Sequence, residues 1–201
     1  MGNFRSVLGS HVHGRIKLSE RQIRSLEEHF NLLEKWNRVI NLTRIRDLEG
    51  IVTLHYCESL VFGSMLPAAN TIVDGGSGGG FPGVPVAVVH EEARVTLVEA
   101  HSRKCVFLRQ ATRYLPNARV LEGRSEDLTI SFDWLVSRAV KWQEVLELAS
   151  GIASNIGLLL SLRDAESVRR VPGFAWNEAK PLPWGEQRVA LLGQVQTRRS
   201  T

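Results

Sequence analysis

A glycine-rich segment from Asp74 to Gly83 is the part of the chain whose residue types and spacing most directly suggest chemistry. It follows a short apolar run that predicts a strand over 71–74, and Pro82 is well placed to open the next helix. Glycine accepts positive φ angles and lets a ligand approach the main chain without a Cβ in the way. The order of strand, glycine turn and helix therefore predicts a ligand-binding loop.

Two ligands fit this loop. Gly78, Gly80 and Gly83 match the dinucleotide fingerprint, so an NAD-dependent oxidoreductase is one hypothesis. In the other frame Asp74 stands before Gly76 and Gly78, where its carboxylate would repel a pyrophosphate and favour a cation such as S-adenosylmethionine. Pro82 also removes one N–H donor that a pyrophosphate would use. Glu99, at the end of the next predicted strand, could accept ribose hydroxyls of either ligand and does not discriminate between them.

The elements around the loop alternate between strands and helices. The patterns predict strands over 71–74, 94–99, 119–122, 132–136 and 156–162, and helices over 102–115 and 142–149. Such alternation is typical of an α/β fold with a doubly wound, mostly parallel sheet, in which ligands bind outside the carboxyl ends of the strands. A last strand over 188–195 follows a short connection, which makes it antiparallel.

Residues 1–66 predict an N-terminal helical cap on a core formed by 67–201, the two packed as one unit. Ser19 and Gln22 have the form of a capping box, and Ile23, Leu26, Phe30 and Leu33 then recur at helical spacing up to about Trp36. Asp47 can cap a second helix over 48–62. The first 17 residues are interpreted as a mobile arm.

The charge is unevenly distributed along the 201 residues, although the net charge is only +4. Residues 1–46 carry nine Lys/Arg and four Glu, residues 47–162 nine basic and thirteen acidic residues, and residues 163–201 seven basic and four acidic ones. Arginine, with its planar fork, supplies 20 of the 25 basic residues and suits phosphate. Candidates for phosphate contacts are Arg5, Arg15, Lys17, Arg21, Arg24, Arg169, Arg170, Arg198 and Arg199.

Composition limits the other classes of function. No apolar run approaches the roughly 20 residues of a membrane span, and residues 1–10 lack a secretory signal, so we expect a cytoplasmic protein. Cys57 and Cys105 are far apart with no second pair, which predicts neither a disulfide framework nor a zinc site. We therefore expect no metal, and two reduced thiols in or near the core.

Four stretches together resemble one family. They are residues 36–43 with His55 and 59–60, residues 74–85, residues 96–99 with 103–104 and 107–110, and residues 137–139. In this order they resemble the small-subunit ribosomal RNA methyltransferase G family, also called glucose-inhibited division protein B. The resemblance implies a Rossmann-like methyltransferase fold and an enzyme that methylates N7 of one guanine in 16S ribosomal RNA with S-adenosylmethionine. The implied partner is 16S rRNA or the small ribosomal subunit, and the oligomeric state stays open, with a monomer preferred.

The resemblance also implies the site residues. Cofactor positions fall on Gly76, Gly78, Phe81, Glu99, Ser125, Glu126 and Arg138, to which the loop analysis adds Asp74. Arg138 would hold the methionine carboxylate or the O6/N7 edge of guanine. Guanine N7 has a free lone pair and loses no proton, so positioning replaces a general base.

The sequence departs from the family pattern at several positions. Gly75 stands where an aliphatic residue is usual, Gly79 where Ala or Pro is common, and Glu58 where Asp is usual. Arg163 and Asp164 replace the common Lys-Gly pair, which motivates a third hypothesis: a binding-only, ribosome-associated protein with the same fold.

Other conspicuous side chains have structural interpretations. We expect His55 to be a packing residue, Trp36 and Asn41 to join the cap to the sheet, and Trp134 to lie in the core.

Overall fold

The computed structural model describes residues 3–138, 141–185 and 187–196. Within these ranges eight strands form one sheet in the order β3-β2-β1-β4-β5-β8-β6, with β7 paired to β8. They are β1 (Thr71–Gly75), β2 (Arg94–Glu99), β3 (Ala118–Glu122), β4 (Phe132–Arg138), β5 (Ala153–Ser161), β6 (Phe174–Trp176), β7 (Lys180–Pro181) and β8 (Arg188–Val195). The first five strands are parallel and β8 runs antiparallel to β5, which confirms the predicted fold class.

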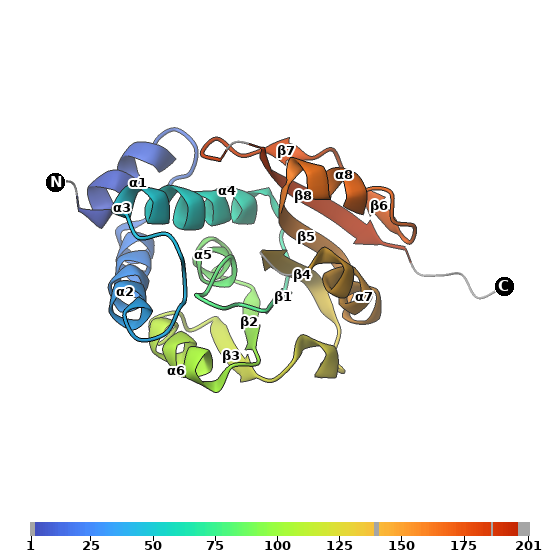
Figure 1. Ribbon diagram of the computed structural model, residues 1–201, viewed down its shortest axis with the longest axis horizontal. Helices are drawn as coiled ribbons and strands as arrows, with labels where there is room; N and C mark the ends of the chain where they lie inside the picture. Colours follow the sequence, from blue (N-terminus) through green and yellow to red (C-terminus); the bar gives the residue numbers. More distant parts are fainter. Residues whose placement is uncertain (1–2, 139–140, 186, 197–201) are drawn as a thin grey trace.

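Helices cover both faces of the sheet (Figure 1). They are α4 (Glu58–Met65), α5 (Gly83–Val89) and α6 (Ser102–Ala111) on one face, and α7 (Trp142–Ile152) and α8 (Leu162–Val168) on the other. Alternate residues of one strand serve the two cores: Leu97 packs with the first group and Val98 with the second. Trp134 is buried, as predicted, and so are both free cysteines.

The capping-box helix forms as predicted. In α2 (Glu20–Asn37) the Ser19 hydroxyl accepts from the Gln22 N–H at 3.3 Å, while the Gln22 side chain accepts from the Ser19 N–H at 2.8 Å. The prediction that the first 17 residues form a mobile arm was wrong, because α1 (Phe4–Val12) is a helix packed on α2. Phe4, Leu8 and Val12 recur every fourth residue and are buried, so they give α1 an apolar face.

The second cap helix is interrupted. Asp47 caps it as predicted, by accepting from the Gly50 N–H at 2.6 Å, and α3 (Leu48–Ile51) then passes into the π-helical turn η1 (Val52–Cys57) before α4 begins. A π-turn shifts the side chains that follow it around the helix axis, and such turns are frequent at functional sites. Here it supplies His55 and Tyr56, and α4 then begins with Glu58.

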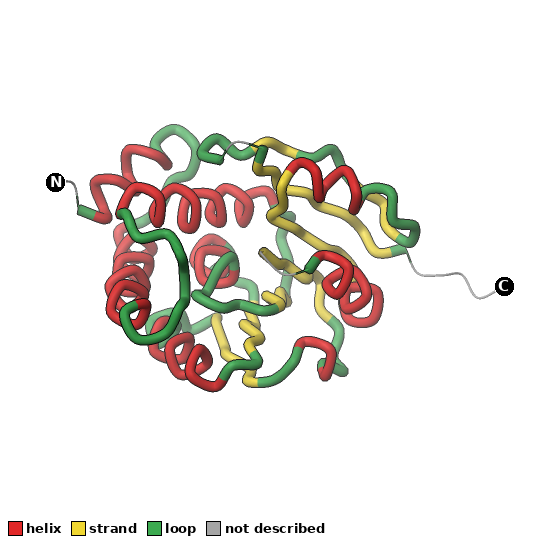
Figure 2. The backbone as a smooth tube through the Cα atoms, in the orientation of Figure 1, coloured by secondary structure: helices red, strands yellow, loops and turns green. Residues whose placement is uncertain are grey.

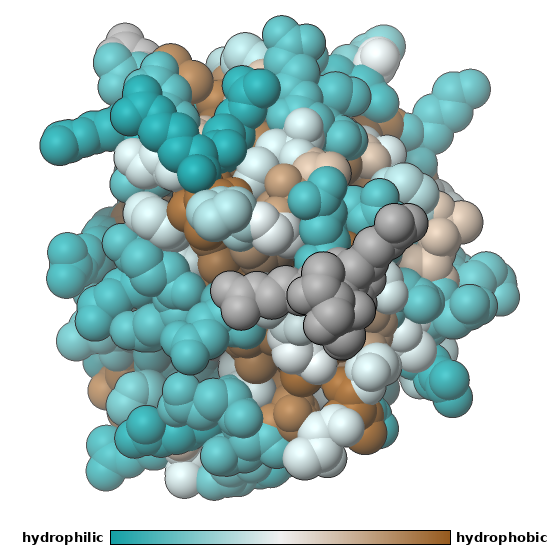
Figure 3. All heavy atoms as spheres, turned by 90° about the vertical axis from the view of Figure 1, so that its right-hand side faces the viewer, coloured by the Kyte–Doolittle hydropathy of each residue, from teal (hydrophilic) through white to brown (hydrophobic). Residues whose placement is uncertain are grey.

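The C-terminal third contains elements that the sequence patterns did not reveal. Leu162, predicted to end a strand, starts α8 instead, because the Ser161 hydroxyl caps the new helix by accepting from the Asp164 N–H at 3.1 Å. The strands β6 and β7 have only three and two residues, too few for a periodic pattern. Figure 3 shows the face that lies on the right-hand side of Figure 1. Hydrophilic side chains dominate this face, and apolar ones appear between them.

Within the described ranges, we find no helix with the length and apolar character needed to span a membrane.

Candidate functional site

The glycine loop connects β1 to α5 at the carboxyl edge of the sheet (Figures 1 and 2). Three of its glycines have positive φ angles, 75° at Gly76, 55° at Gly78 and 87° at Gly80, which L side chains rarely adopt. The N–H groups of Gly76 and Ser77 donate to the Val98 carbonyl at 3.0 and 2.9 Å, so the loop is tied to β2. A Cβ on Gly78 would meet nothing closer than 3.9 Å, which means that its main chain borders open space.

Asp74 lies directly beneath this loop and is fully buried. Its Oδ2 accepts from the Gly83 N–H at 3.1 Å, whereas its Oδ1 has no hydrogen-bond partner within the described ranges. Burial raises the pKa of Asp74 to about 7. The first N–H of α5, which a pyrophosphate would need, is therefore already bonded to a carboxylate.

Glu99 ends β2 and meets the same loop. Its Oε2 accepts from the Gly78 N–H and its Oε1 from the His101 N–H, both at 2.9 Å, and the residue is almost completely buried. The structure thus brings together Asp74, Gly76, Gly78 and Glu99.

Of the two cofactor residues predicted after β3, Ser125 lies near the glycine loop and the side chain of Glu126 points to solvent. The Ser125 hydroxyl lies 3.5 Å from the point where a Cβ on Gly75 would stand, so Ser125 borders the end of β1. The Glu126 side chain is 68% exposed and pairs with Arg124 at 3.2 Å. The structure therefore places Ser125, but not the Glu126 carboxylate, beside the glycine loop.

Phe81 points its ring inward. It stacks on the His55 ring with centroids 4.7 Å apart and meets Tyr56 and His29 edge-to-face at 5.0 and 5.2 Å. These contacts anchor the loop to the cap, so Phe81 offers a ligand only its main chain.

His55 is half-buried and packs on this ring, as expected for a packing residue, but only one of its two ring nitrogens has a hydrogen-bond partner among the described residues. Its Nε2 lies 2.7 Å from the Thr43 hydroxyl, and its buried Nδ1 has no partner. Burial, together with the nearby Arg138 and Arg188, lowers the pKa of His55 to about 3. The imidazole is therefore neutral at physiological pH.

Arg138 ends β4 with its side chain only 10% exposed. One terminal nitrogen, Nη2, lies 3.5 Å from Oε2 of the fully buried Glu58, and the other, Nη1, is buried and has no partner in the part of the chain that the structure describes. Burial lowers the pKa of Arg138 to about 10, so its guanidinium stays charged at neutral pH.

Sequence reasoning missed His29 as part of this site. His29 lies on the apolar face of α2, where its Nδ1 is 2.6 Å from the Tyr56 hydroxyl and its Nε2 is 3.0 Å from the Gly79 carbonyl. Burial lowers its pKa to about 4, so it is a neutral bridge between cap and loop. A histidine among Leu26, Phe30 and Leu33 was the available signal, because a polar ring on an apolar face needs buried partners.

The predicted junction between cap and sheet is half right. Trp36 donates its indole N–H to Gln110 of α6 at 3.2 Å and packs edge-on against Phe107. Asn41 is exposed, and Asn37 instead holds the loop after α2 by accepting from the N–H groups of Leu42 and Thr43. The amide of Asn37 is buried at the end of α2, which is why it, rather than Asn41, makes these bonds.

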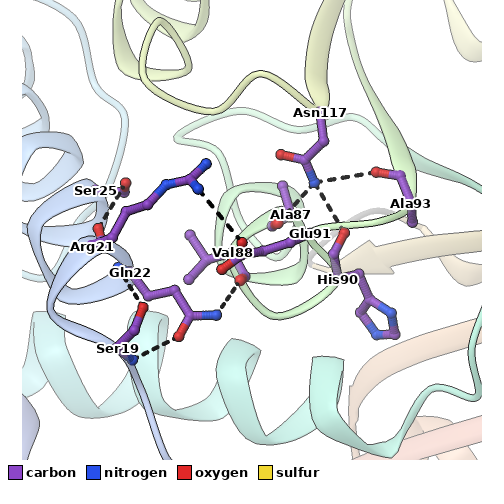
Figure 4. Close-up of polar contacts among 10 residues, drawn as sticks. All are labelled: Ser19, Arg21, Gln22, Ser25, Ala87, Val88, His90, Glu91, Ala93 and Asn117. Carbon is purple, nitrogen blue, oxygen red and sulfur yellow. Dashed lines mark hydrogen bonds and ion pairs between the residues drawn. The ribbon is translucent and has the colours of Figure 1, made fainter.

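A separate hollow of about 190 Å³ lies at the opposite, amino edge of the sheet, between α2 and the end of α5 (Figure 4). Two of its polar side chains are bonded to the protein main chain: Gln22 donates to the Val88 carbonyl at 2.8 Å, and the Asn117 amide donates to the carbonyls of Ala87, His90 and Ala93. Of the residues that the sequence predicted to be functional, Arg21 lines this hollow, whereas the predicted cofactor residues follow strands at the opposite edge of the sheet.

The strand order, the glycine loop after β1 and the acidic ends of β1 and β2 define the class of Rossmann-like methyltransferase folds. A putative O-methyltransferase from Klebsiella pneumoniae superimposes with a TM-score of 0.63 at 14% identity, covering 96% of this chain and 97% of that one. A SAM-dependent O-methyltransferase from Thermotoga maritima gives a TM-score of 0.58 at 13% identity, covering 84% and 73%.

Within that class, the chain belongs to the rRNA small subunit methyltransferase G family, whose model matches residues 22–171. The ribosomal RNA small subunit methyltransferase G of Lactococcus lactis is 33% identical over 201 aligned positions, which cover 88% of this chain and 84% of the relative. The proteins of the same name from Dichelobacter nodosus and Neisseria gonorrhoeae are 42% and 40% identical over 61% of this chain. Those two matches span 60% of the length of each relative.

Proposed function

We propose that this protein is an S-adenosylmethionine-dependent methyltransferase that modifies N7 of a guanine in 16S ribosomal RNA. Membership of the rRNA small subunit methyltransferase G family supports the activity, and the names of the relatives support the RNA substrate. The observation that carries the proposal is the Asp74 carboxyl beneath the glycine loop, with its Oδ1 buried and unpartnered. A carboxylate in that place suits a cationic cofactor and opposes a pyrophosphate.

The residues around the loop fit S-adenosylmethionine. Gly76 and Gly78 would let the cofactor lie against the main chain, Glu99 would accept its ribose hydroxyls, and Ser125 would border the adenine. Arg138 carries an unpartnered Nη1, which suits the methionine carboxylate or guanine O6. Phe81 would contribute through its main chain, and the exposed Glu126 carboxylate is the weakest member of the set.

The chemistry requires positioning more than proton transfer. The cofactor supplies a methyl group on a sulfonium, and guanine N7 attacks it with a free lone pair. The protein must hold the two in line and exclude water. The neutral His55 stacks on Phe81 and hydrogen-bonds to Thr43, and the reaction does not need it as a base.

The RNA would approach the carboxyl edge through a group of exposed or half-exposed basic side chains, here called the basic rim. The rim comprises Arg38, Arg44, Arg103, Lys104 and Arg163. Arg103 and Lys104 follow β2 and Arg163 follows β5, so the parallel topology places them at the same edge. Arg38 and Arg44 lie in the loop after α2, which runs past Gly79 at the Leu42 carbonyl (Figure 2). Within the described ranges no rim residue forms an ion pair, which leaves these charges available for phosphate.

Some of the predicted terminal contacts are otherwise engaged. Arg5 pairs with Glu20 and Glu27, and Arg21 lies 3.8 Å from Glu91 at the amino edge. Arg198 and Arg199 lie outside the described residues, whereas Lys17, Arg24, Arg169 and Arg170 are exposed and remain candidates.

A salt titration tests the basic rim. Each phosphate contact contributes about −0.7 to the slope of log affinity against log salt for single-stranded RNA. We expect Arg103→Ala to make that slope shallower by about 0.7, and Arg5→Ala, the matched control, to leave it unchanged. An unchanged slope in Arg103→Ala would mean that Arg103 is a solvated surface residue and does not contact an RNA phosphate.

The two alternative hypotheses have less support. The NAD hypothesis needs a free helix N-terminus, which Asp74 already occupies through the Gly83 N–H, and a Cβ on Gly83 would lie only 2.5 Å from that carboxylate. The binding-only hypothesis rests on Arg163 and Asp164 in place of the common Lys-Gly pair. Because Arg163 is exposed in the first turn of α8, it keeps a positive charge at this edge.

The proposal also includes a cytoplasmic location, a monomeric state, and a cap of residues 1–66 on a core of 67–201. Analytical ultracentrifugation of the full chain tests the monomer.

The decisive experiment combines binding and product mapping. S-adenosylmethionine should bind in isothermal titration, and purified protein should transfer a labelled methyl group to small subunits or naked 16S rRNA at a single guanine N7. Cofactor binding without transfer to either substrate would favour the binding-only protein, and preferential binding of NADH would favour the oxidoreductase.

A further inference from the structure

Three charged side chains from distant parts of the sequence converge beside the candidate site. Glu58 opens α4 in the cap, Arg138 ends β4, and Arg188 begins the antiparallel strand β8. The Nε of Arg188 lies 2.9 and 3.0 Å from the two Glu58 oxygens, and Nη2 of Arg138 lies 3.5 Å from Oε2. One fully buried carboxylate is thus shared by two guanidiniums.

The charges in this triad do not cancel. Two guanidiniums against one carboxylate leave an excess positive charge, and the part of Arg138 that Glu58 does not reach, Nη1, is buried without a partner among the residues that the structure describes. Burial raises the pKa of Glu58, and Arg138 and Arg188 oppose that shift. Because a buried ionised donor without a partner is costly, the arrangement suits an oxygen acceptor that a ligand would supply.

The C-terminal loop fixes Arg188 from the other side. A Cβ on Gly185 would lie 2.5 Å from Cδ of Arg188 and 3.0 Å from Oε1 of Glu58, so the main chain here closes directly over the ion pair. The neighbouring Trp184 donates its indole N–H to His11 of α1 at 3.1 Å. The contacts therefore run from α1 through this loop to Arg188, Glu58 and Arg138.

We propose that Glu58 and Arg188 are positioning residues, which hold the Arg138 guanidinium so that its Nη1 is aimed at an oxygen acceptor of the bound cofactor or of the substrate guanine. Arg188 does not touch the ligand and acts through Glu58, which fixes Nη2 and prevents rotation of the guanidinium plane. The inference rests on the proposed function, because the acceptor is an atom of its cofactor or substrate.

A double-mutant cycle tests the coupling. Glu58→Gln and Gly185→Ala are each made in the wild-type chain and in Arg138→Met, with Gly151→Ala as the control because a Cβ there meets nothing within 4 Å. We expect each of the first two to cost about ten- to hundredfold in cofactor Kd or in single-turnover rate, and to cost little further once Arg138 is gone. Equal losses in both backgrounds, or no loss in either, would overturn the proposal.

The choice of ligand separates the two acceptors. If Nη1 meets the methionine carboxylate, the variants weaken S-adenosylmethionine and S-adenosylhomocysteine but not 5′-methylthioadenosine, which lacks the carboxylate. If Nη1 meets guanine O6, all three affinities stay unchanged and the methyl-transfer rate at saturating cofactor falls. Both outcomes support the positioning role, provided that the loss disappears in Arg138→Met.

Two further measurements keep the test decisive. Glu58→Gln leaves two guanidiniums around a neutral amide and can destabilise the fold, whereas Gly185→Ala changes no charge. The stoichiometry of the calorimetric titration gives the fraction of protein that is folded and able to bind, separately from Kd. Side-chain NMR of ¹⁵N-arginine in the ligand-free protein should show slow rotation of the Arg138 guanidinium, faster in both variants. Equally fast rotation in the wild type would sink the positioning role even if the chain proved to be no methyltransferase, whereas an inactive wild type would overturn only the proposed function.

Discussion

The two edges of the sheet differ in how completely they satisfy their buried polar groups. At the amino edge the hollow of about 190 Å³ is lined by side chains whose hydrogen bonds close on the protein itself (Figure 4). Among the described residues, six buried side-chain atoms lack a hydrogen bond, and five of them belong to Asp74, Arg138 and the helical segment 55–59, although one of the five, Glu58 Oε1, is ion-paired with Arg188 Nε at 2.9 Å. Only Trp176 Nε1 lies elsewhere, on β6.

This contrast separates shape from function. A buried polar atom without a partner costs about 1–3 kcal/mol, so several in one place indicate a group that an external ligand completes. A hollow whose polar groups are already paired gains little from a ligand. We therefore infer that ligands bind at the carboxyl edge, although the hollow of about 190 Å³ lies at the amino edge.

The largest expected effect comes from closing the space over the glycine loop. Gly78→Val puts a branched side chain where the cofactor must approach, and we expect the affinity for S-adenosylmethionine to fall by more than about a hundredfold, or ~2.8 kcal/mol. Gly14→Val is the matched control: Gly14 also has a positive φ, 72°, with open space around it, but it lies far from the loop in the chain segment after α1. Isothermal titration of both variants distinguishes backbone strain from lost binding, and normal affinity in Gly78→Val would reject the loop as the site.

A pH titration sharpens the comparison next. Asp74, with a pKa of about 7, is neutral in acid and ionised in base, and a cationic cofactor binds the ionised form. Its affinity should therefore fall by up to about tenfold per pH unit below about pH 7, and Asp74→Asn should give weak binding without that slope. The stability of the free protein should depend on pH in the opposite direction. Because the pKa of Asp74 is raised in the folded state, the folded protein should lose stability as the pH rises from about 4 to about 7.

The amino edge supplies the control for this titration. Asp133 accepts from the N–H groups of Thr71 and Asn70, which lower its pKa, so it stays ionised at neutral pH. Asp133→Asn should leave the pH dependence of cofactor affinity unchanged. Titration calorimetry at pH 6, 7 and 8 compares the two variants, and a parallel slope in wild type and Asp74→Asn would contradict the assignment to Asp74.

The sequence was sufficient to predict that Asp74, the glycines and Glu99 meet at the carboxyl edge, because the signals for this arrangement are local. Asp74, the glycines and Glu99 each follow an apolar strand, and parallel strands bring their ends together whatever else the chain does. The capping residues Ser19 and Asp47 are likewise readable from a few neighbours. The apolar spacing of α1 was also present in the sequence, but the prediction of a mobile arm overlooked it.

The features that the sequence did not predict depend on contacts between segments that are distant in the chain. Glu58 is separated from Arg138 by 80 positions and from Arg188 by 130. No local sequence pattern predicts that a cap helix, a central strand and a C-terminal strand contribute to one cluster of charges. The π-turn that positions His55 leaves no periodic signature in six residues. The pairing of Arg5 and Arg21 with glutamates likewise became visible only in three dimensions.

At the amino edge, a substitution should change stability without changing binding. Asn117→Ala removes an amide that donates to three carbonyl oxygens, at 3.0, 3.0 and 3.2 Å. We expect a loss of about 1–3 kcal/mol in the free energy of unfolding, because buried acceptors lose their donor. Urea denaturation measures the loss, and calorimetry should give wild-type cofactor affinity for the folded variant. A change in affinity without a change in stability would reverse the assignment of the two edges.

The smallest effect is expected at the ion pair across the mouth of the same hollow. Arg21 and Glu91 have side chains that are 66% and 44% exposed, with nitrogen and oxygen 3.8 Å apart, and exposed pairs contribute about 0–1 kcal/mol. Arg21→Ala should therefore leave stability, cofactor affinity and the salt slope of RNA binding nearly unchanged, in contrast with Arg103→Ala in the basic rim. If instead the slope became shallower by about 0.7 in Arg21→Ala, RNA would reach around the molecule to the amino edge. The division into one functional and one structural edge would then hold for the cofactor but not for the RNA.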